Sequence, residues 1–429
     1  MLRLHDLVLL IVGTVIGSGI FLVPGIILRD VGNSLPVALS VWVVGGVLSL
    51  LGALTYGELS AKQPEAGGLY VYIRDGFGRF PAFLFGWILF FVVSTGSIAT
   101  LAVAFSNYLG ELYPLGFWGA KLVSLVMIAV IGVVNVRGTR QSANLQNVTT
   151  IAKVLAIVAM AALLLWFGNQ FHSNAVAAAA MTPSSRLSGI GLAMVSVLWA
   201  YEGWQYATFS AGETVRPRRD FPLAFLIGVL VLVGVYIFAN LGYVAALGTS
   251  GVSVSNRVAA TAVATTLSPA IAKGVTIAIL ISMFSAANSI TLTSPRVYYA
   301  MAKDGLFFRR LAEVHPRFGT PAFAIGATVF WASVLAASGT FEQLLTYVVF
   351  IGWSFYAVAA ASIFVYRKRE AGEAKSSYRV PGYPWTPLTF IAVVIAFVLN
   401  TIVAQPARAG IGLAVVLTGV PAYFIWRRR

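Results

Sequence analysis

Apolar runs of twenty or more residues recur along almost the whole chain, separated by short polar or Gly- and Pro-containing turns. A helix needs about 20 mostly apolar residues to cross a bilayer. The pattern predicts twelve such spans, at residues 6–28, 36–60, 81–109, 117–136, 145–167, 187–211, 222–247, 271–300, 321–339, 343–366, 386–404 and 409–426. It therefore predicts an all-α integral membrane protein whose residues 1–429 form a single transmembrane domain, with the lipid bilayer as its surroundings.

The composition supports this interpretation. Hydrophobic residues make up 59% of the chain and charged residues 10%, against roughly 45–50% and 25% in soluble domains. These proportions exclude a water-soluble globular protein. Twelve spans would use about 240 residues, which leaves no room for a sizeable soluble domain.

The charge balance is strongly basic, with 29 Lys and Arg against 14 Asp and Glu. In a soluble protein this excess would suggest binding to nucleic acid. Here most of the basic residues fall in the loops on the N-terminal side of the predicted spans, as the positive-inside rule requires of cytoplasmic loops. We therefore expect a multi-pass protein with both termini in the cytoplasm and no nucleic-acid partner.

Two of the predicted spans are interrupted. The first contains GTVIGSGIF, with Gly13, Gly17 and Gly19, and the sixth contains the polar segment 199–204. Broken helices in corresponding positions indicate inverted repeats that meet at a central binding site. We expect repeats at about 6–167 and 187–366, with peripheral helices at 386–426.

The first break offers backbone amides and the start of a half-helix at Gly17, Ser18 and Gly19. The positive end of a helix dipole suits a carboxylate. The alternative is close helix packing, because Gly13 and Gly17 form a GxxxG pair, which is common in membrane helices.

The second break would release the carbonyls of Trp199, Ala200 and Tyr201 as acceptors for an ammonium group. A site that binds an anion at one end and a cation at the other fits a free α-amino acid. Trp199 could close over the substrate as a gate, or it could simply pack between helices.

Other polar residues have more than one interpretation. Gln205 could hydrogen-bond a substrate side chain, as could Ser94 and Ser97, or these groups could join helices to one another. Glu202 lies near the membrane centre, where a carboxylate is a candidate functional group. It could carry a proton, face a cationic substrate, or be a structural side chain at the helix break.

Lys153 lies inside the apolar sequence TTIAKVLAIVAM. Its ammonium could replace a bound metal cation beside the first break, or it could snorkel to the cytoplasmic edge of the membrane. The sequence alone leaves both interpretations open.

No phosphate loop, HExxH or GxSxG motif occurs, and the chain has no cysteine. We expect no enzymatic activity, catalytic residue, metal or other cofactor. Without cysteine, no disulfide can link the chain to an ancillary subunit.

Several motifs resemble the amino acid, polyamine and organocation (APC) transporter superfamily, and within it a bacterial relative of the L-type amino acid transporters. They are GTVIGSGIF in the first span, EAGGLYVYI after the second, NLQNVTTIAKVLAI in the fifth, WAYEGWQYATFSAGE followed by RPRRDFPLA, SPRVYYAMAKDGLFF after the eighth, and YRVPGYP before the eleventh. The resemblance covers nearly the whole chain.

The resemblance implies a LeuT-type fold of five plus five helices in the inner membrane, with helices 1 and 6 broken. It implies that Ile16, Gly17, Ser18 and Gly19 bind the substrate carboxylate, that Trp199 to Tyr201 hold the amine, and that Lys153 stands where sodium-coupled relatives bind a cation. Two positions depart from the family pattern, because Trp199 replaces a frequent Phe and Glu202 replaces a small residue.

These expectations combine into a sodium-independent amino acid transporter, an exchanger of small or medium neutral amino acids that works by alternating access. The alternative is a proton-coupled carrier, or one for cationic amino acids or polyamines, which Glu202 motivates. A membrane-embedded enzyme or a non-transporting sensor is a further alternative that no catalytic constellation supports.

Overall fold

The protein is described here from a computed structural model, which covers residues 2–110, 112–169, 183–339, 341–369, 378–404 and 406–427. Over these residues the chain is helical, with one isolated β-bridge between Leu2 and Thr214. The expected all-α architecture is confirmed. Residues 111, 340 and 405 lie outside the described residues, and they fall in the expected first repeat, the expected second repeat and the expected peripheral helices.

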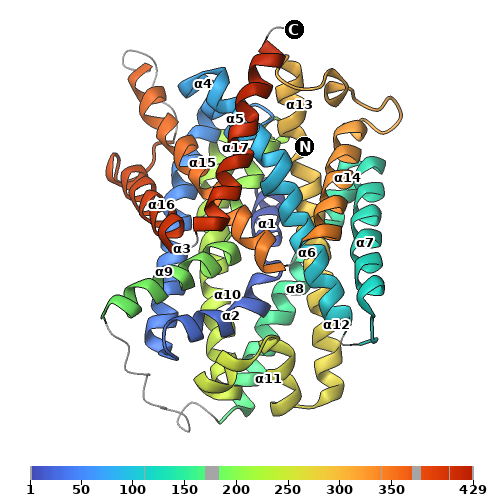
Figure 1. The fold of residues 1–429 in the computed structure, drawn as a ribbon, viewed down its shortest axis with the longest axis vertical. Coiled ribbons are helices and arrows are strands. Elements are labelled where there is room, and N and C mark those ends of the chain that lie inside the picture. Colours follow the sequence, from blue (N-terminus) through green and yellow to red (C-terminus); the bar gives the residue numbers. More distant parts are fainter. Residues whose placement is uncertain are drawn as a thin grey trace.

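The first half of the chain forms nine of the helices and one π-helical turn, shown in blue to green in Figure 1. They are α1 (Leu4–Val15), α2 (Gly19–Asp30), α3 (Leu35–Lys62), α4 (Leu69–Phe77), α5 (Arg79–Ile88), η1 (Leu89–Val93), α6 (Ser94–Leu109), α7 (Phe117–Arg137), α8 (Thr139–Phe167) and α9 (Pro183–Ala200).

The second half begins with a 3₁₀ segment and ends with two long apolar helices. Its elements are η2 (Trp204–Glu213), α10 (Pro217–Val254), α11 (Val258–Thr266), α12 (Pro269–Thr293), α13 (Pro295–Lys303), η3 (Arg309–Ala312), α14 (Ala322–Ser338), α15 (Phe341–Arg369), α16 (Trp385–Ala404) and α17 (Pro406–Arg427). The expected eighth span divides into α12 and α13 before Pro295, whose missing N–H interrupts the helix.

Nine helical stretches among the described residues are long and apolar enough to cross a membrane, and the bent pair α1–α2 makes a tenth. Helix α14 is apolar but shorter, at 17 residues. The ten do not include α9 and η2, which stand at the sixth expected span and are separated by a turn. The count of twelve spans stays a prediction.

The two interruptions expected from the sequence are present. Helices α1 and α2 are bent by 48° across residues 16–18. Helix α9 ends at Ala200, and η2 begins at Trp204 after a turn. Gly203 has φ of 128°, a left-handed conformation that favours glycine and ends α9 at this point.

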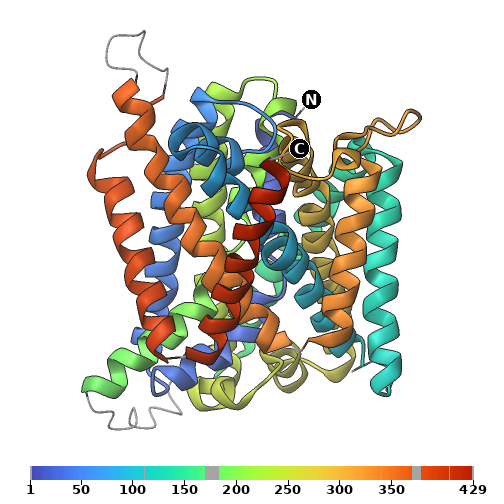
Figure 2. The same cartoon turned by 45° about the horizontal axis from the view of Figure 1, so that its top comes forward.

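Helix α1 lies in the interior of the bundle, whereas α9 runs from the outer edge towards it (Figure 1). Helix α1 packs against α8, α10, α12 and η2, and α2 packs against α9 and α10. Helices α16 and α17 pack against α15, and they run along the outside of the bundle in Figure 2. The start of α1 and the end of α17 lie at the same end of the molecule (Figure 2).

That end, which also carries α4, α13 and η3, is closed by polar contacts. Arg296 on α13 donates two hydrogen bonds to Glu213 at the end of η2, at 2.7 and 2.9 Å. The backbone of Leu2 pairs with Glu213 and Val215. These contacts tie the N-terminus, the end of the second broken helix and α13 together, and they leave a cavity of only about 10 Å³.

A buried carboxylate holds three helical regions together at the same end. Glu58 on α3 is fully buried and accepts two hydrogen bonds from Arg367 on α15, at 2.9 and 2.6 Å. It also lies 2.9 Å from the ammonium of Lys62 and accepts a hydrogen bond from the Val380 amide, in the segment that leads to α16.

We predict that Glu58→Ala destabilises the protein by about 3–5 kcal/mol, because it leaves two largely buried cations without their carboxylate. Thermal unfolding of the purified protein in detergent measures this as a lower melting temperature. The control is Glu65→Ala, whose half-exposed side chain pairs with Arg74 and should change stability by about 0–1 kcal/mol. Equal melting temperatures for the two variants would contradict the prediction.

Candidate functional site

The break between α1 and α2 exposes backbone groups in the middle of the bundle. Ile16, Gly17 and Ser18 lie between the helices, and Ile16 has a non-helical ψ of 89°. The last carbonyls of α1 and the first N–H groups of α2 lose their helical partners there. In a membrane such groups must find other partners within the protein.

Lys153 provides the main partner for these carbonyls. Its ammonium, on α8, donates hydrogen bonds of 2.6 Å to the carbonyl oxygens of Gly13 and Ile16. Only 2% of the residue is exposed. The structure therefore puts the ammonium against the broken helix, and its replacement of a metal cation there stays a prediction.

Hydroxyl groups satisfy the neighbouring carbonyls. Ser282 on α12 donates to Ile16 at 3.1 Å. Tyr236 on α10 lies 3.2 Å from the carbonyl of Val15 and 2.8 Å from the carbonyl of Ala200. The Tyr236 hydroxyl thus contacts both broken helices.

The two breaks touch each other through their backbones. A Cβ atom added to Gly19 would come within 2.6 Å of the Ala200 Cα, and one added to Gly203 would meet Thr14 at 2.9 Å. The structure therefore brings Gly19 and Ala200, one candidate from each break, into direct contact. Gly13 instead faces Gln146 and Thr150 on α8, so its lack of a side chain serves helix packing.

The carbonyls of the second break are partly engaged. Trp199 accepts a hydrogen bond from the Glu202 amide at 3.0 Å, and Ala200 accepts the bond from Tyr236. The Ala200 carbonyl oxygen has a second lone pair, so it retains capacity for another donor. Tyr201 is fully buried, and its ring packs against Trp42 and Tyr236.

The side chain of Trp199 reaches from one break to the other. Its indole nitrogen donates to the Ser18 hydroxyl at 3.3 Å, and the residue is 6% exposed. This position allows the gating role suggested by the sequence, because the ring lies directly against the first break.

Glu202 and Gln205 join the second break to α15. The Glu202 Oε1 accepts hydrogen bonds from Gln205 at 2.6 Å and from the Tyr356 hydroxyl at 2.5 Å. Gln205 also contacts Tyr356 at 2.7 Å and accepts from the Gly203 amide. The other carboxylate oxygen, Oε2, is buried and makes no hydrogen bond of ordinary length and angle among the described residues, although the Trp353 indole lies close to the carboxyl.

The serines of the third expected span serve the protein itself. Ser94 donates to the Tyr206 hydroxyl of η2 at 3.3 Å, and Ser97 donates to the Val93 carbonyl of its own helical stretch. The Ser94 contact joins two helical elements, whereas the Ser97 contact stays within one.

Sequence reasoning missed three members of the site, namely Tyr236, Ser282 and Tyr356. A hydroxyl group in an apolar span must find a partner, which was the available signal. The signal could not say which carbonyl each hydroxyl binds, because that depends on how distant helices pack.

Comparisons with known proteins show the family of the chain. The model of a family described as amino acid permease matches residues 2–422. The serine/threonine exchanger SteT of Bacillus subtilis is 32% identical over 98% of this chain and 95% of its own length.

Mammalian transporters are also similar. The human large neutral amino acids transporter small subunit 2 is 32% identical over 97% of this chain and 78% of its own length. The human cystine/glutamate transporter is 29% identical over 97% of this chain and 83% of its own length. The chain therefore belongs to the amino acid permease family of the APC superfamily, whose members here are membrane transporters and not enzymes.

Proposed function

We propose that this protein is a sodium-independent exchanger of small or medium neutral amino acids that works by alternating access. The observation that carries the proposal is the meeting of two broken helices in the bundle interior, with a lysine ammonium on the carbonyls of the first. Discontinuous helices of this kind form substrate sites in transporters.

In this proposal the substrate carboxylate lies at the start of α2, against the backbone of Ile16, Gly17, Ser18 and Gly19. The unpaired N–H groups of the first helical turn and the helix dipole favour an anion there. The substrate ammonium lies against the backbone carbonyls of Trp199, Ala200 and Tyr201. The contact between Gly19 and Ala200 supports this arrangement, because it puts both ends of a zwitterion within one site.

Lys153 makes transport independent of sodium in this proposal. A sodium ion would be held by oxygen atoms such as those of Gly13, Ile16 and Ser282. The ammonium already supplies a positive charge and two hydrogen bonds at two of these oxygens.

The choice of neutral amino acids follows from the relatives. The names of two of them specify serine, threonine or large neutral amino acids, and all are aligned over nearly this whole chain. The expected twelve spans, the inverted repeats at 6–167 and 187–366, the peripheral helices at 386–426, the inner-membrane location and the cytoplasmic termini belong to the same proposal.

A second candidate function is a proton-coupled carrier, or a carrier of cationic amino acids or polyamines. The observation that favours it is the buried carboxyl of Glu202, whose Oε2 atom makes no hydrogen bond of ordinary length and angle among the described residues, although the Trp353 indole lies close to the carboxyl. A carboxylic acid proton or a substrate cation would complete this group. The bonds from Gln205 and Tyr356 favour a structural role instead, because they fix Glu202 against α15.

We predict that purified protein in liposomes takes up labelled neutral amino acid only when the vesicles are preloaded with unlabelled amino acid. The uptake should be the same with and without sodium. Preload, sodium and pH are varied separately. Uptake into empty vesicles driven by a pH gradient would reject the exchanger in favour of the second candidate.

We predict that Lys153→Ala slows exchange about tenfold or more while the protein still folds. The substitution removes the hydrogen-bond donor of two carbonyl groups. If this changes the free-energy difference between two transport states by about 1.4 kcal/mol, the ratio of their populations changes tenfold. Lys121→Ala is the matched control, since Lys121 also binds a helix-end carbonyl, that of Ala336, away from the breaks. Unchanged exchange by Lys153→Ala would return this lysine to a structural role.

We predict that Glu202→Gln keeps exchange within about tenfold of the original rate, because the amide oxygen still accepts from Tyr356 and one hydrogen bond is worth about 1 kcal/mol. The pH dependence of exchange should not change. A variant that loses a pH dependence seen in the unaltered protein would support the proton-coupled candidate instead.

A further inference from the structure

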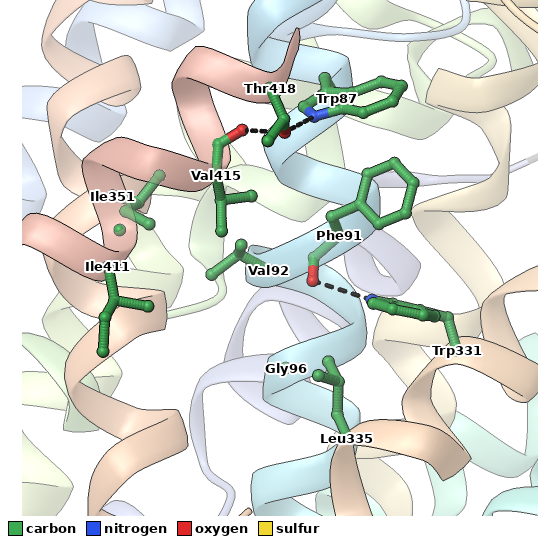
Figure 3. Close-up of a pocket in the computed structure, with 11 residues that line it drawn as sticks. Trp87, Phe91, Val92, Gly96, Trp331, Leu335, Ile351, Ile411, Val415 and Thr418 are labelled. Carbon is green, nitrogen blue, oxygen red and sulfur yellow. Dashed lines mark hydrogen bonds between the residues drawn. The ribbon is translucent and has the colours of Figure 1, made fainter. Parts of the chain in front are cut away.

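A cavity of about 360 Å³ lies among the helices, and none of its lining residues belongs to the two breaks. Its walls come from α5, η1 and α6, from α14, from α15 and from α17. Figure 3 shows side chains from these elements around a common space, with Trp87 and Thr418 at one end and Leu335 at the other. The volume is within the range of about 300–1,000 Å³ that is typical of ligand sites.

The walls are apolar, and their few polar groups already have partners. The indole nitrogen of Trp87 donates to Thr418 at 3.1 Å, and the Thr418 hydroxyl donates to the Val415 carbonyl at 2.6 Å. The indole of Trp331 donates to the Phe91 carbonyl at 2.9 Å. A buried water needs two to four polar partners, so this cavity would stay dry and would exclude a polar ligand.

The Phe91 carbonyl belongs to the π-helical turn η1. A π-helical turn widens the helix and leaves its carbonyls available to other donors, and such turns are frequent at functional sites. Here the released group binds Trp331 across the space between η1 and α14. The wall is therefore built by specific contacts and is not a packing defect.

The cavity is continuous with the outer, lipid-facing surface of the bundle. Ile411 lines it and is also 52% exposed, and Leu413 and Leu417 on the same helix are exposed as well. Thr418 lies about 12 Å along α17 from Trp426, at 1.5 Å per residue. If Trp426 marks the membrane interface, Thr418 lies close to the middle of a hydrocarbon core of about 30 Å. The end of a lipid acyl chain in that leaflet reaches the same depth.

A path of aromatic rings leads from the cavity to positive charge. Trp87 contacts both Trp426 and Phe307, and Trp426 contacts Phe308. The next residues, Arg309 and Arg310, are exposed at the start of η3. Aromatic rings at the membrane interface followed by basic residues favour an anionic lipid head group.

We propose that this cavity binds one anionic phospholipid, with an acyl chain between α14 and α17 and the phosphate group beside Arg309 and Arg310. An empty space of this size would deprive its walls of dispersion contacts, and the acyl chain supplies them. The lipid comes from the leaflet on the side of the basic loops. The proposal does not depend on the transported substrate.

The test uses phosphatidylglycerol with a photoactivatable group near the end of its acyl chain, in vesicles of phosphatidylcholine that contain the full chain. After illumination, mass spectrometry maps the labelled peptides. We expect label on α14 and α17 at the cavity. Val415→Phe fills the cavity with an aromatic ring. It should reduce the labelling of the cavity residues to the amount found on the lipid-exposed face of α17. Leu417→Phe adds the same ring on that exposed face and should leave the cavity label unchanged.

The head group is tested with the double variant Arg309→Gln and Arg310→Gln and with a phosphatidylcholine probe of the same chain. Both should lower the cavity label, whereas Arg317→Gln, an exposed arginine outside the path, should not. Equal label in the original and Val415→Phe proteins would overturn the proposal, as would equal label by the two probes. Cross-linking of the cavity to a second copy of the chain would also overturn it.

Melting temperatures of all variants verify that they fold. If Val415→Phe does not fold, Leu335→Phe fills the same cavity from α14 and takes its place in the comparison.

Discussion

The structure depends on one constraint, that a backbone N–H or C=O group in hydrocarbon must find a partner inside the protein. Two helices are broken in the interior, and each break leaves groups without helical partners. The side chains of Lys153, Tyr236 and Ser282 supply the missing donors at the first break. The arrangement of α8, α10 and α12 around α1 follows from this need, since each of these helices brings one of those donors.

Among the described residues, two ionisable side chains lie at the breaks inside the bundle, Lys153 and Glu202. The ion pairs of Glu58, Glu213 and Arg74 lie instead in the basic loops and at the helix ends beside them, where they tie helices together. Lys153 is the cation inside, and it is compensated by carbonyl dipoles rather than by a carboxylate. A carboxylate partner would cancel its charge, whereas carbonyls leave a net positive charge beside the start of α2.

Much of this could be predicted from the sequence, because the signals were local. Glycine in GTVIGSGIF and the polar segment after Trp199 predicted both breaks, and apolar run lengths predicted most helices. The contacts between distant elements could not be predicted. The bond between Glu202 and Tyr356, for example, joins residues 154 positions apart. The division of α12 from α13 has a local cause, because Pro295 interrupts the helix there. The choice between the two interpretations of Lys153 also required knowing how α8 lies against α1.

Tyr236 has a hydroxyl group with a single proton and two carbonyl oxygens within reach, one from each break. It can donate fully to only one of them at a time. The Val15 carbonyl also accepts a hydrogen bond from the Gly17 amide at 2.8 Å, so it keeps a partner when the hydroxyl donates to Ala200. The balance therefore favours the bond to the second break, and a donor that arrives at Ala200 would release the Tyr236 hydroxyl to the first.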